Sequence, residues 1–358
     1  MASRQELNSG VGEVRAGLGF DEGRLGEWMT ANVDGFKGPL AVRQFNGGQS
    51  NPTYKLTTPG QNYVLRRKPP GLLLKSAHAV DREYRVITAL HAAGFPAPRT
   101  FGLCTDDGVI GTWFYVMDCV EGRVIWDTTF PDVAWGDRPA YFDAMNATIA
   151  QLHSFDPAAI GLGDFGKPGN YFARQIDRWS KQYKASETEK IEAMDNLIEW
   201  LPNNIPPGDE TAIVHGDYRL DNMIFHPTEP RVLAVLDWEL STLGHPMADF
   251  SYHMMTWHLS PTEFRGLLGH DLKALGIPTE EEYLEMYLWQ TGSDAATSSE
   301  WGFYMAYNMF RMAGILQGIM GRVVAGNAAS AQALEAGKRA RPMAELGWKQ
   351  VERILAGG

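Results

Sequence analysis

The sequence predicts an α+β protein of two lobes: a β-rich first lobe with one main helix, and a mostly helical second lobe that carries one β-hairpin. Three observations predict this fold class. Short apolar stretches separated by turn residues fill positions 40–67, helical spacing dominates after Gly122, and the strand pattern returns only at 211–238. The 358 residues are enough for two lobes with separate cores.

The composition is that of an ordinary folded protein, with 44% hydrophobic and 21% charged residues. A net charge of −11 argues against a general nucleic-acid binder, whose surface is normally basic. Cys104 and Cys119 are too few for a disulfide framework and fit a reducing compartment. No stretch reaches the roughly 18 apolar residues of a membrane span, and the N-terminus lacks a signal-peptide core. We therefore expect a cytoplasmic protein with no nucleic-acid or membrane partner, whose oligomeric state stays open.

Strands and one helix make up the first predicted lobe. The Pro-Gly pair at 59–60 marks a turn, so residues 53–57 and 61–66 are predicted to form a hairpin. A helix follows and stops near Gly94. Its residues at helical spacing are Val80, Glu83, Tyr84, Ile87 and Leu90. A further strand pair ends in "TWFYVMDCVEG" at 112–122.

The change from strands to helices predicts the domain boundaries. We place the first lobe at 1–117, a short connection at 118–122 and the second lobe at 123–358. Two lobes joined in this way suggest a cleft between them for a ligand.

Polar residues stand beside apolar strands in "HGDYRLDNMIFHPTEPRVLAVLDWE", positions 215–239. The turn "HPTEP" centres a hairpin near Thr228, which brings Asn222 opposite the region of 235–237. The amide oxygen of Asn222 and the carboxylate of Asp237 then converge. Charges beside buried strands are costly unless they are paired or hold an ion, and Mg²⁺ prefers oxygen ligands shared with substrate phosphates. The spacing therefore predicts a magnesium site.

Asp217 lies five residues before Asn222 and overlooks the same volume without being a metal ligand. A carboxylate there can accept a hydroxyl proton during phosphoryl transfer. His215 is expected to brace the loop by hydrogen bonding. The alternative is that these are ordinary turn and cap residues, but a loop, a hairpin and a second Asp together are more specific than H-G-D alone.

The pattern H-G-D-x-x-x-x-N, followed by an apolar hairpin and an Asp, resembles the aminoglycoside phosphotransferase family, which shares the protein-kinase-like fold. Here "DWE" stands where a protein kinase has D-F-G. The resemblance implies ATP and Mg²⁺ as cofactors, Asp217 as the base, and Asn222 and Asp237 as metal ligands. Asp249, in "GHPMADFSY", matches a family position that supports the catalytic loop.

If the resemblance holds, the first lobe must bind ATP. The glycines of "FNGGQSNPTY" let the backbone approach phosphates. Period-two alternation puts Val64, over the adenine, on one strand face with Arg66, a cation for the phosphates, although Arg67 and Lys68 are also near. Glu83 lies in the apolar stripe of its helix and is expected to pair with Arg66. The predicted nucleotide-binding residues are Gly47, Gly48, Gln49, Ser50, Asn51, Val64, Arg66, Glu83, Met117, Asp118 and Val120.

The phosphate acceptor is predicted to be a small molecule with a hydroxyl group, because "DWELSTLGHPMADFSY" is too short for a protein-kinase activation loop. The segments "REYRVITALHAAGFPAPR" and "VLRRKPPG" look closest to the kinase-like domain fused to some acyl-CoA dehydrogenases and to its free-standing bacterial relatives. The remaining residues leave no room for a dehydrogenase domain, so we expect the free-standing form. This resemblance implies a hydroxyacyl-CoA or hydroxy acid as acceptor.

One late helix suggests where the acceptor binds. At 100° per residue, Tyr304, Arg311, Gly318 and Arg322 share a narrow stripe, which favours either an anionic ligand or internal ion pairs. Our hypothesis is that Arg311, with Arg322 and Tyr304 as further candidates, faces the acceptor. The alternatives are an aminoglycoside or another small alcohol as acceptor, or a nucleotide-binding scaffold without activity. A scaffold is disfavoured because the base and both metal ligands are present.

Overall fold

The computed structural model describes residues 10–46, 51–71, 79–294, 296–327 and 332–357. The chain forms two compact units. The first comprises Met1–Trp126, Ala158–Phe165 and Arg219–Ser241, and the second comprises Asp127–Pro157, Gly166–Tyr218 and Thr242–Gly358. The predicted lobe boundaries at 117 and 123 stay a prediction.

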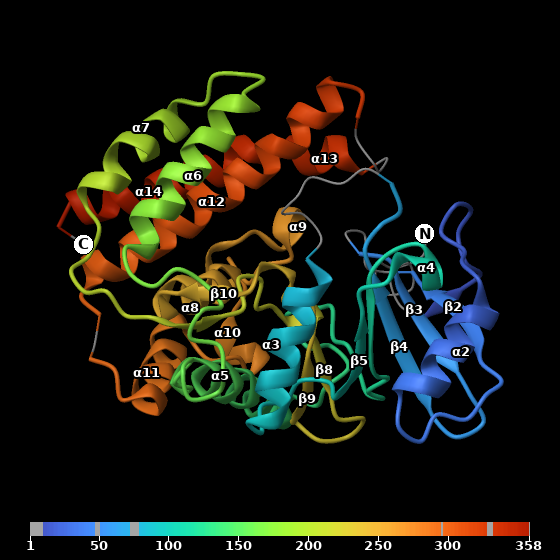
Figure 1. The fold of residues 1–358 in the computed structure, drawn as a ribbon. Helices are drawn as coiled ribbons and strands as arrows, with labels where there is room; N and C mark the ends of the chain where they lie inside the picture. The colour runs from blue at the N-terminus through green and yellow to red at the C-terminus, as the bar shows by residue number, and fades with distance from the viewer. Residues whose placement is uncertain (1–9, 47–50, 72–78, 295, 328–331, 358) are drawn as a thin grey trace. The chain divides into compact units, whose positions relative to one another are not determined.

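The first unit contains a six-stranded antiparallel sheet (Figure 1). Its spatial order is β1-β2-β3-β4-β6-β5. The strands are β1 Val11–Gly12, β2 Ala41–Phe45, β3 Thr53–Thr57, β4 Asn62–Arg67, β5 Thr100–Cys104 and β6 Phe114–Asp118. The predicted hairpin is confirmed as β3 and β4, with ends that differ by no more than one residue.

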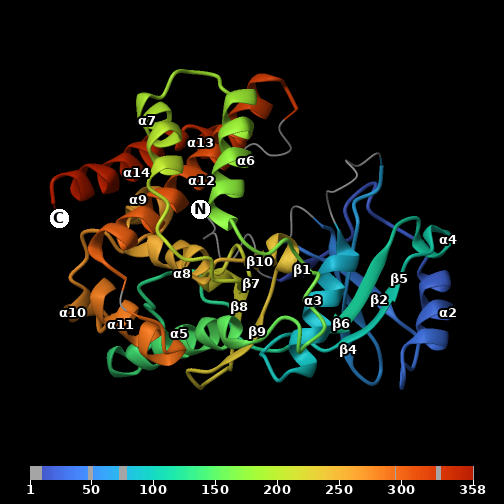
Figure 2. The same cartoon turned by 60° about the vertical axis from the view of Figure 1, so that its left-hand side comes forward.

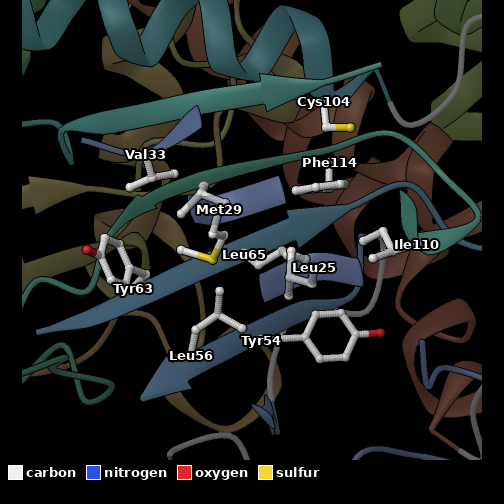
Figure 3. Packing of buried hydrophobic residues seen from close by; sticks show 11 residues of the cluster. Leu25, Met29, Val33, Tyr54, Leu56, Tyr63, Leu65, Cys104, Ile110 and Phe114 are labelled. Carbon is white, nitrogen blue, oxygen red and sulfur yellow. The ribbon is translucent and has the colours of Figure 1, made fainter. Parts of the chain in front are cut away.

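Alternation along β4 divides its side chains between two environments. Tyr63 and Leu65 enter an apolar cluster with Leu25 and Met29 of helix α2, Glu22–Asn32, and Figure 3 shows the two helix residues meeting Leu65 above the strands. Fully burying a side chain of this size contributes about 1.5–3 kcal/mol. The alternate residues Val64 and Arg66 fall on the other face of the strand and are not part of this cluster.

Helix α3, Val80–Ala92, follows the helical spacing predicted from the sequence. It buries Glu83 together with Val80, Ile87 and Leu90, and Gly94 follows it with φ +83°, a conformation that favours glycine. The first unit also contains the helix α4 Asp107–Ile110, the 3₁₀ turns η3 Leu220–Asn222 and η4 Trp238–Leu240, and the hairpin β8 Met223–Phe225 and β9 Val232–Val235.

The second unit is mainly helical, and α6, α7, α12 and α14 lie side by side in both views (Figures 1 and 2). Its strands β7 Ala212–Val214 and β10 Thr242–Gly244 pair antiparallel. The helices are α5 Arg138–Ser154, α6 Tyr171–Ala185, α7 Glu192–Trp200, α8 Pro246–Met254, α9 Pro261–Phe264, α10 Leu272–Leu275, α11 Glu280–Thr291, α12 Ser298–Val324, α13 Ala333–Gly337 and α14 Ala340–Leu355, with the 3₁₀ turns η1 Trp135–Asp137, η2 Leu201–Asn203 and η5 Met255–His258. Among the described residues, no helix is both long and apolar enough to cross a membrane.

Candidate active site

The β8–β9 hairpin brings the backbone of Asn222 close to the backbone beside Asp237. Met223 pairs with Val235, within one residue of the predicted register. Beyond the last paired residues, the backbone N–H of Leu236 donates to the carbonyl oxygen of Asn222 at 2.8 Å. Asn222 is therefore opposite the residue that precedes Asp237, which confirms the predicted register.

Asp237 has an unusual backbone conformation, with φ +67° and ψ +61°. Non-glycine residues seldom adopt this left-handed region, and in a folded protein such strain is often found at functional sites. The neighbouring Trp238 is 1% exposed, packs edge-to-face on Phe95 and donates from Nε1 to the carbonyl of Val235 at 2.9 Å. The buried indole thus holds the turn that places the Asp237 carboxylate, whose side chain is 34% exposed.

Arg66 joins the helix carboxylate to the hairpin carboxylate. Its Nε lies 2.7 Å from Oε2 of Glu83, and its Nη2 lies 2.6 Å from Oδ1 of Asp237 and 3.5 Å from Oε2 of Glu239. The predicted pairing of Arg66 with Glu83 is confirmed. Burial opposes the Arg66 cation, but Glu83 and Asp237 outweigh it and raise the pKa of Arg66.

Two further donors hold Glu83. Nδ2 of Asn51 lies 2.7 Å from Oε1, and the hydroxyl of Tyr115 lies 3.1 Å from Oε2. Asn51 is the last residue of the predicted phosphate loop, and it is fully buried. The other four, Gly47, Gly48, Gln49 and Ser50, lie outside the described residues. Neither Tyr115 nor Glu239 was identified from the sequence, although Tyr115 could have been found as the cross-strand neighbour of Arg66.

The predicted adenine residues lie on neighbouring strands. Val64 of β4 pairs with Met117 of β6, and the two are 7% and 8% exposed. Asp118 ends β6, and Val120 follows in the half-buried connection. At Gly122 a Cβ atom would lie 2.3 Å from the carbonyl oxygen of Phe225, so this position requires glycine. The connection is in this way held against the β8–β9 hairpin.

The loop of Asp217 belongs to the second unit, whose boundary with the first falls between Tyr218 and Arg219. Asp249, in the first turn of α8, accepts the backbone N–H groups of His215 and Gly216 at 2.6 and 2.8 Å. His153 Nε2 lies 3.3 Å from the same carboxylate. Burial would raise the pKa of Asp249, but these hydrogen bonds lower it below its ordinary value. The carboxylate therefore stays ionised while it supports the loop.

Asp217 forms hydrogen bonds within this unit through both its backbone and its side chain. Its backbone N–H donates to Nδ1 of His215 at 3.2 Å, and its Oδ1 accepts the hydroxyl of Tyr252 at 2.6 Å. Sequence reasoning missed Tyr252 and His153. Tyr252 could have been found, because it follows Asp249 by three residues on α8 and so shares its helix face. His153 lies on the distant α5, and nothing in its own segment indicated this partner.

The three predicted acceptor residues do not come together. Arg311 is 8% exposed and donates from Nη2 to the carbonyl of Gly216 at 2.7 Å, a backbone oxygen instead of a carboxylate. Tyr304 is buried and stacks on Phe172. Arg322 is exposed in the last turn of α12, about 16 Å along the helix from Arg311 at 1.5 Å per residue. Only Arg311 reaches the Asp217 loop.

Comparison with known proteins connects these residues to a family. The family described as "Phosphotransferase enzyme family" matches residues 41–288, which include both the Arg66 and the Asp217 segments. Acyl-CoA dehydrogenase family member 11 of Gallus gallus is 44% identical over 357 residues, covering 97% of this chain and 46% of that protein. The chain spans less than half the length of the curated relatives it matches.

Solved structures give the same result for the fold. A Ralstonia eutropha JMP134 protein, solved as a candidate aminoglycoside phosphotransferase, is 58% identical with a TM-score of 0.87, covering 94% of this chain and 99% of that one. Choline kinase of Cryptosporidium parvum Iowa II is 12% identical with a TM-score of 0.63, covering 94% and 97%. The predicted α+β, protein-kinase-like fold is confirmed.

Proposed function

Because the chain belongs to the phosphotransferase enzyme family, we propose that it transfers the γ-phosphate of ATP to a hydroxyl group of a small molecule. The observation that carries the proposal is Arg66, which bridges Glu83 and Asp237. A buried structural ion pair would not need one carboxylate that is one-third exposed on a left-handed backbone. A phosphate-binding arginine explains the arrangement: Glu83 would keep the guanidinium of Arg66 in place, and Asp237 would release it when the nucleotide binds.

In the first unit, Arg66 would contact the ATP phosphates while Glu83 keeps its guanidinium oriented. The apolar pair Val64 and Met117 would contact the adenine, and the backbone at 118–120 would meet the adenine edge. The predicted loop at 47–51 would approach the phosphates. Positioning and charge neutralisation of this kind supply most of the rate in phosphoryl transfer.

Asn222 and Asp237 fit a magnesium ion. Both offer oxygen, and the hairpin register brings their backbones together. Among the described residues, no group of three or more His, Cys, Asp or Glu side chains is arranged to hold a metal. Mg²⁺ does not need such a group, because it commonly combines one or two protein ligands with waters and phosphates. When bound, it would neutralise charge on the β- and γ-phosphates.

Asp217 would accept the proton of the acceptor hydroxyl. The hydroxyl oxygen would form a bond to the γ-phosphorus as the bond from that phosphorus to the bridging oxygen breaks, and ADP would leave. His215 and Asp249 would hold the loop, as their hydrogen bonds to its backbone indicate.

A hydroxyacyl-CoA or a hydroxy acid is the acceptor that we favour. The support is the 44% identity to an acyl-CoA dehydrogenase family member across nearly the whole chain. An aminoglycoside is the second candidate, because the 58% identical structure was solved as a candidate aminoglycoside phosphotransferase. Other small alcohols and an inactive scaffold remain alternatives.

The test is ADP release with Mg-ATP across hydroxyacyl-CoAs, hydroxy acids, aminoglycosides and amino alcohols. We expect one class to stimulate release, and Asp217→Asn to lower that turnover by about 100-fold or more while Mg-ATP still binds. Stimulation that survives in Asp217→Asn would contradict the base assignment. ATP binding with no stimulation by any class would favour the scaffold.

A further inference from the structure

The backbone of Gly216, the residue before Asp217, is held at both its N–H and its carbonyl group. Asp249 accepts the N–H of Gly216 at 2.8 Å, and Arg311 donates to its carbonyl oxygen at 2.7 Å. The two partners come from different helices, α8 and α12. Gly216 has φ +82°, a backbone conformation that glycine adopts readily and that residues with a side chain disfavour. Both contacts involve a charged group, which makes them stronger than ordinary hydrogen bonds.

Arg311 has the environment of an interior cation. It is 8% exposed, and its guanidinium carbon lies 5.2 Å from the ring centre of Tyr252 and 6.0 Å from that of Trp179. A guanidinium stays charged in proteins, so burying it is costly unless its surroundings compensate. Ring faces and a carbonyl oxygen supply that compensation. The Gly216 carbonyl is therefore part of the environment that compensates the buried Arg311 cation.

Tyr252 links this cation to the side chain of the proposed base. Its ring lies against Arg311, and its hydroxyl donates to Oδ1 of Asp217 at 2.6 Å. A hydrogen bond to one oxygen restricts rotation of the carboxylate about its Cβ–Cγ bond. Arg311 and Tyr252 thus act on adjacent parts of one loop: the first on the backbone of Gly216, the second on the side chain of Asp217.

We propose that Tyr252 and Arg311 are positioning residues that orient the Asp217 carboxylate for proton transfer. The inference rests on the proposed role of Asp217 as the base. It replaces acceptor binding by Arg311 with support of the loop, and it assigns Tyr252 a role that the sequence did not indicate. Side chains that only position a catalytic group act on turnover and leave substrate affinity nearly unchanged.

The first test compares Tyr252→Phe with Tyr283→Phe. Each variant loses one buried hydroxyl of the second unit, but the Tyr283 hydroxyl lies 3.0 Å from Nε2 of His253 instead of the Asp217 carboxylate. We expect Tyr252→Phe to lower kcat by about 10-fold, with the KM for ATP and for the acceptor within about twofold. Tyr283→Phe should leave kcat nearly unchanged. Equal kcat values in the two variants would overturn the role of Tyr252.

The second test compares Arg311→Lys with Arg138→Lys, because Arg138 also donates to backbone carbonyls of the second unit. We expect Arg311→Lys alone to lower kcat, since an ammonium cannot reproduce the fork of the guanidinium. An increase in acceptor KM at unchanged kcat would overturn positioning and restore acceptor binding by Arg311.

Amide hydrogen exchange separates this inference from the proposed function, since it needs neither ATP nor an acceptor. We expect exchange in the segment 215–218 to rise by about 10-fold in Arg311→Lys, which loses one hydrogen bond to the loop. Arg138→Lys should not change it. Unchanged exchange in Arg311→Lys would overturn the support role of Arg311, whether or not the protein proved to have transferase activity. Faster exchange in this variant, together with a wild-type protein that shows no turnover, would leave the support role intact and refute the kinase proposal.

Discussion

Asp237 and Asp249 are both candidate site residues, but their carboxylates differ in exposure and in the groups that they contact. The Asp249 side chain has no exposed surface, and its partners are two backbone N–H groups and His153. The Asp237 side chain is 34% exposed, and its partner is the guanidinium of Arg66. Backbone donors cannot be exchanged without unfolding the loop, whereas a side-chain cation can be exchanged for a metal. The difference identifies one carboxylate as structural and the other as a candidate ligand site.

Removing the structural carboxylate should have the largest effect on stability. In Asp249→Ala, two buried backbone N–H groups lose their acceptor, and each unsatisfied group costs about 1–3 kcal/mol of the free energy of unfolding. We expect a total loss of about 3 kcal/mol or more, measured by urea denaturation. Asp177→Ala is the control, because Asp177 pairs with Lys181 at the surface. A loss below 1 kcal/mol in Asp249→Ala would break the comparison.

Removing the exposed carboxylate should change ligand binding more than stability. We expect Asp237→Ala to weaken Mg-dependent ATP binding by about 10-fold and to lower the unfolding free energy less than Asp249→Ala does, because Glu83 still pairs with Arg66. Isothermal titration calorimetry with and without Mg²⁺ measures the first effect. Glu239→Ala is the matched control, since its carboxylate lies 3.5 Å from the same arginine nitrogen. Unchanged Mg-ATP affinity in Asp237→Ala would refute the assignment of Asp237 as a metal ligand.

The helix that carries Asp249 should also make stability depend on pH. Burial lowers the pKa of His245 and of His253 to about 4, so both are neutral in the folded protein at pH 6. In the unfolded chain their pKa is about 6.5, so between pH 6.5 and pH 4 the unfolded chain binds more protons than the folded protein. The free energy of unfolding therefore decreases as the pH is lowered through this window. We expect a loss on the order of a few kcal/mol across this window.

His245→Asn sharpens this prediction. Nδ1 of His245 accepts the N–H of Met247 as the N-cap of α8, and asparagine also caps helices but does not titrate. Thermal melts from pH 7 to pH 4.5 should show a shallower loss of stability in the variant than in the wild type. An identical slope would show that His245 does not contribute.

Local patterns predicted most elements and the residues attached to them. Turn chemistry predicted the β3–β4 hairpin. It also predicted the β8–β9 hairpin, whose register brings Asn222 towards the Asp237 turn, because the period of a strand is fixed by its backbone. The apolar stripe of α3 predicted that Glu83 needed a cation. Contacts between distant segments were missed: Tyr115 on Glu83, and His153 on Asp249. The first follows from the pairing of Tyr115 with Arg66 across two strands, whereas no local pattern indicates the contact of His153.

By itself, the sequence predicted where the candidate residues lie: Asp217 before a hairpin, Asn222 and Asp237 at the open end of that hairpin, and Arg66 on the first sheet. These follow from periodicity and turn residues, which act over a few positions. Only the tertiary structure decided how they are supported. Arg311 illustrates this, because its helical stripe left open whether it meets a ligand or the protein, and the folded chain places its guanidinium on the Gly216 carbonyl. Two helices widely separated in sequence build that support, and burial supplies the physical reason: an interior charge must find its partner wherever the fold provides one.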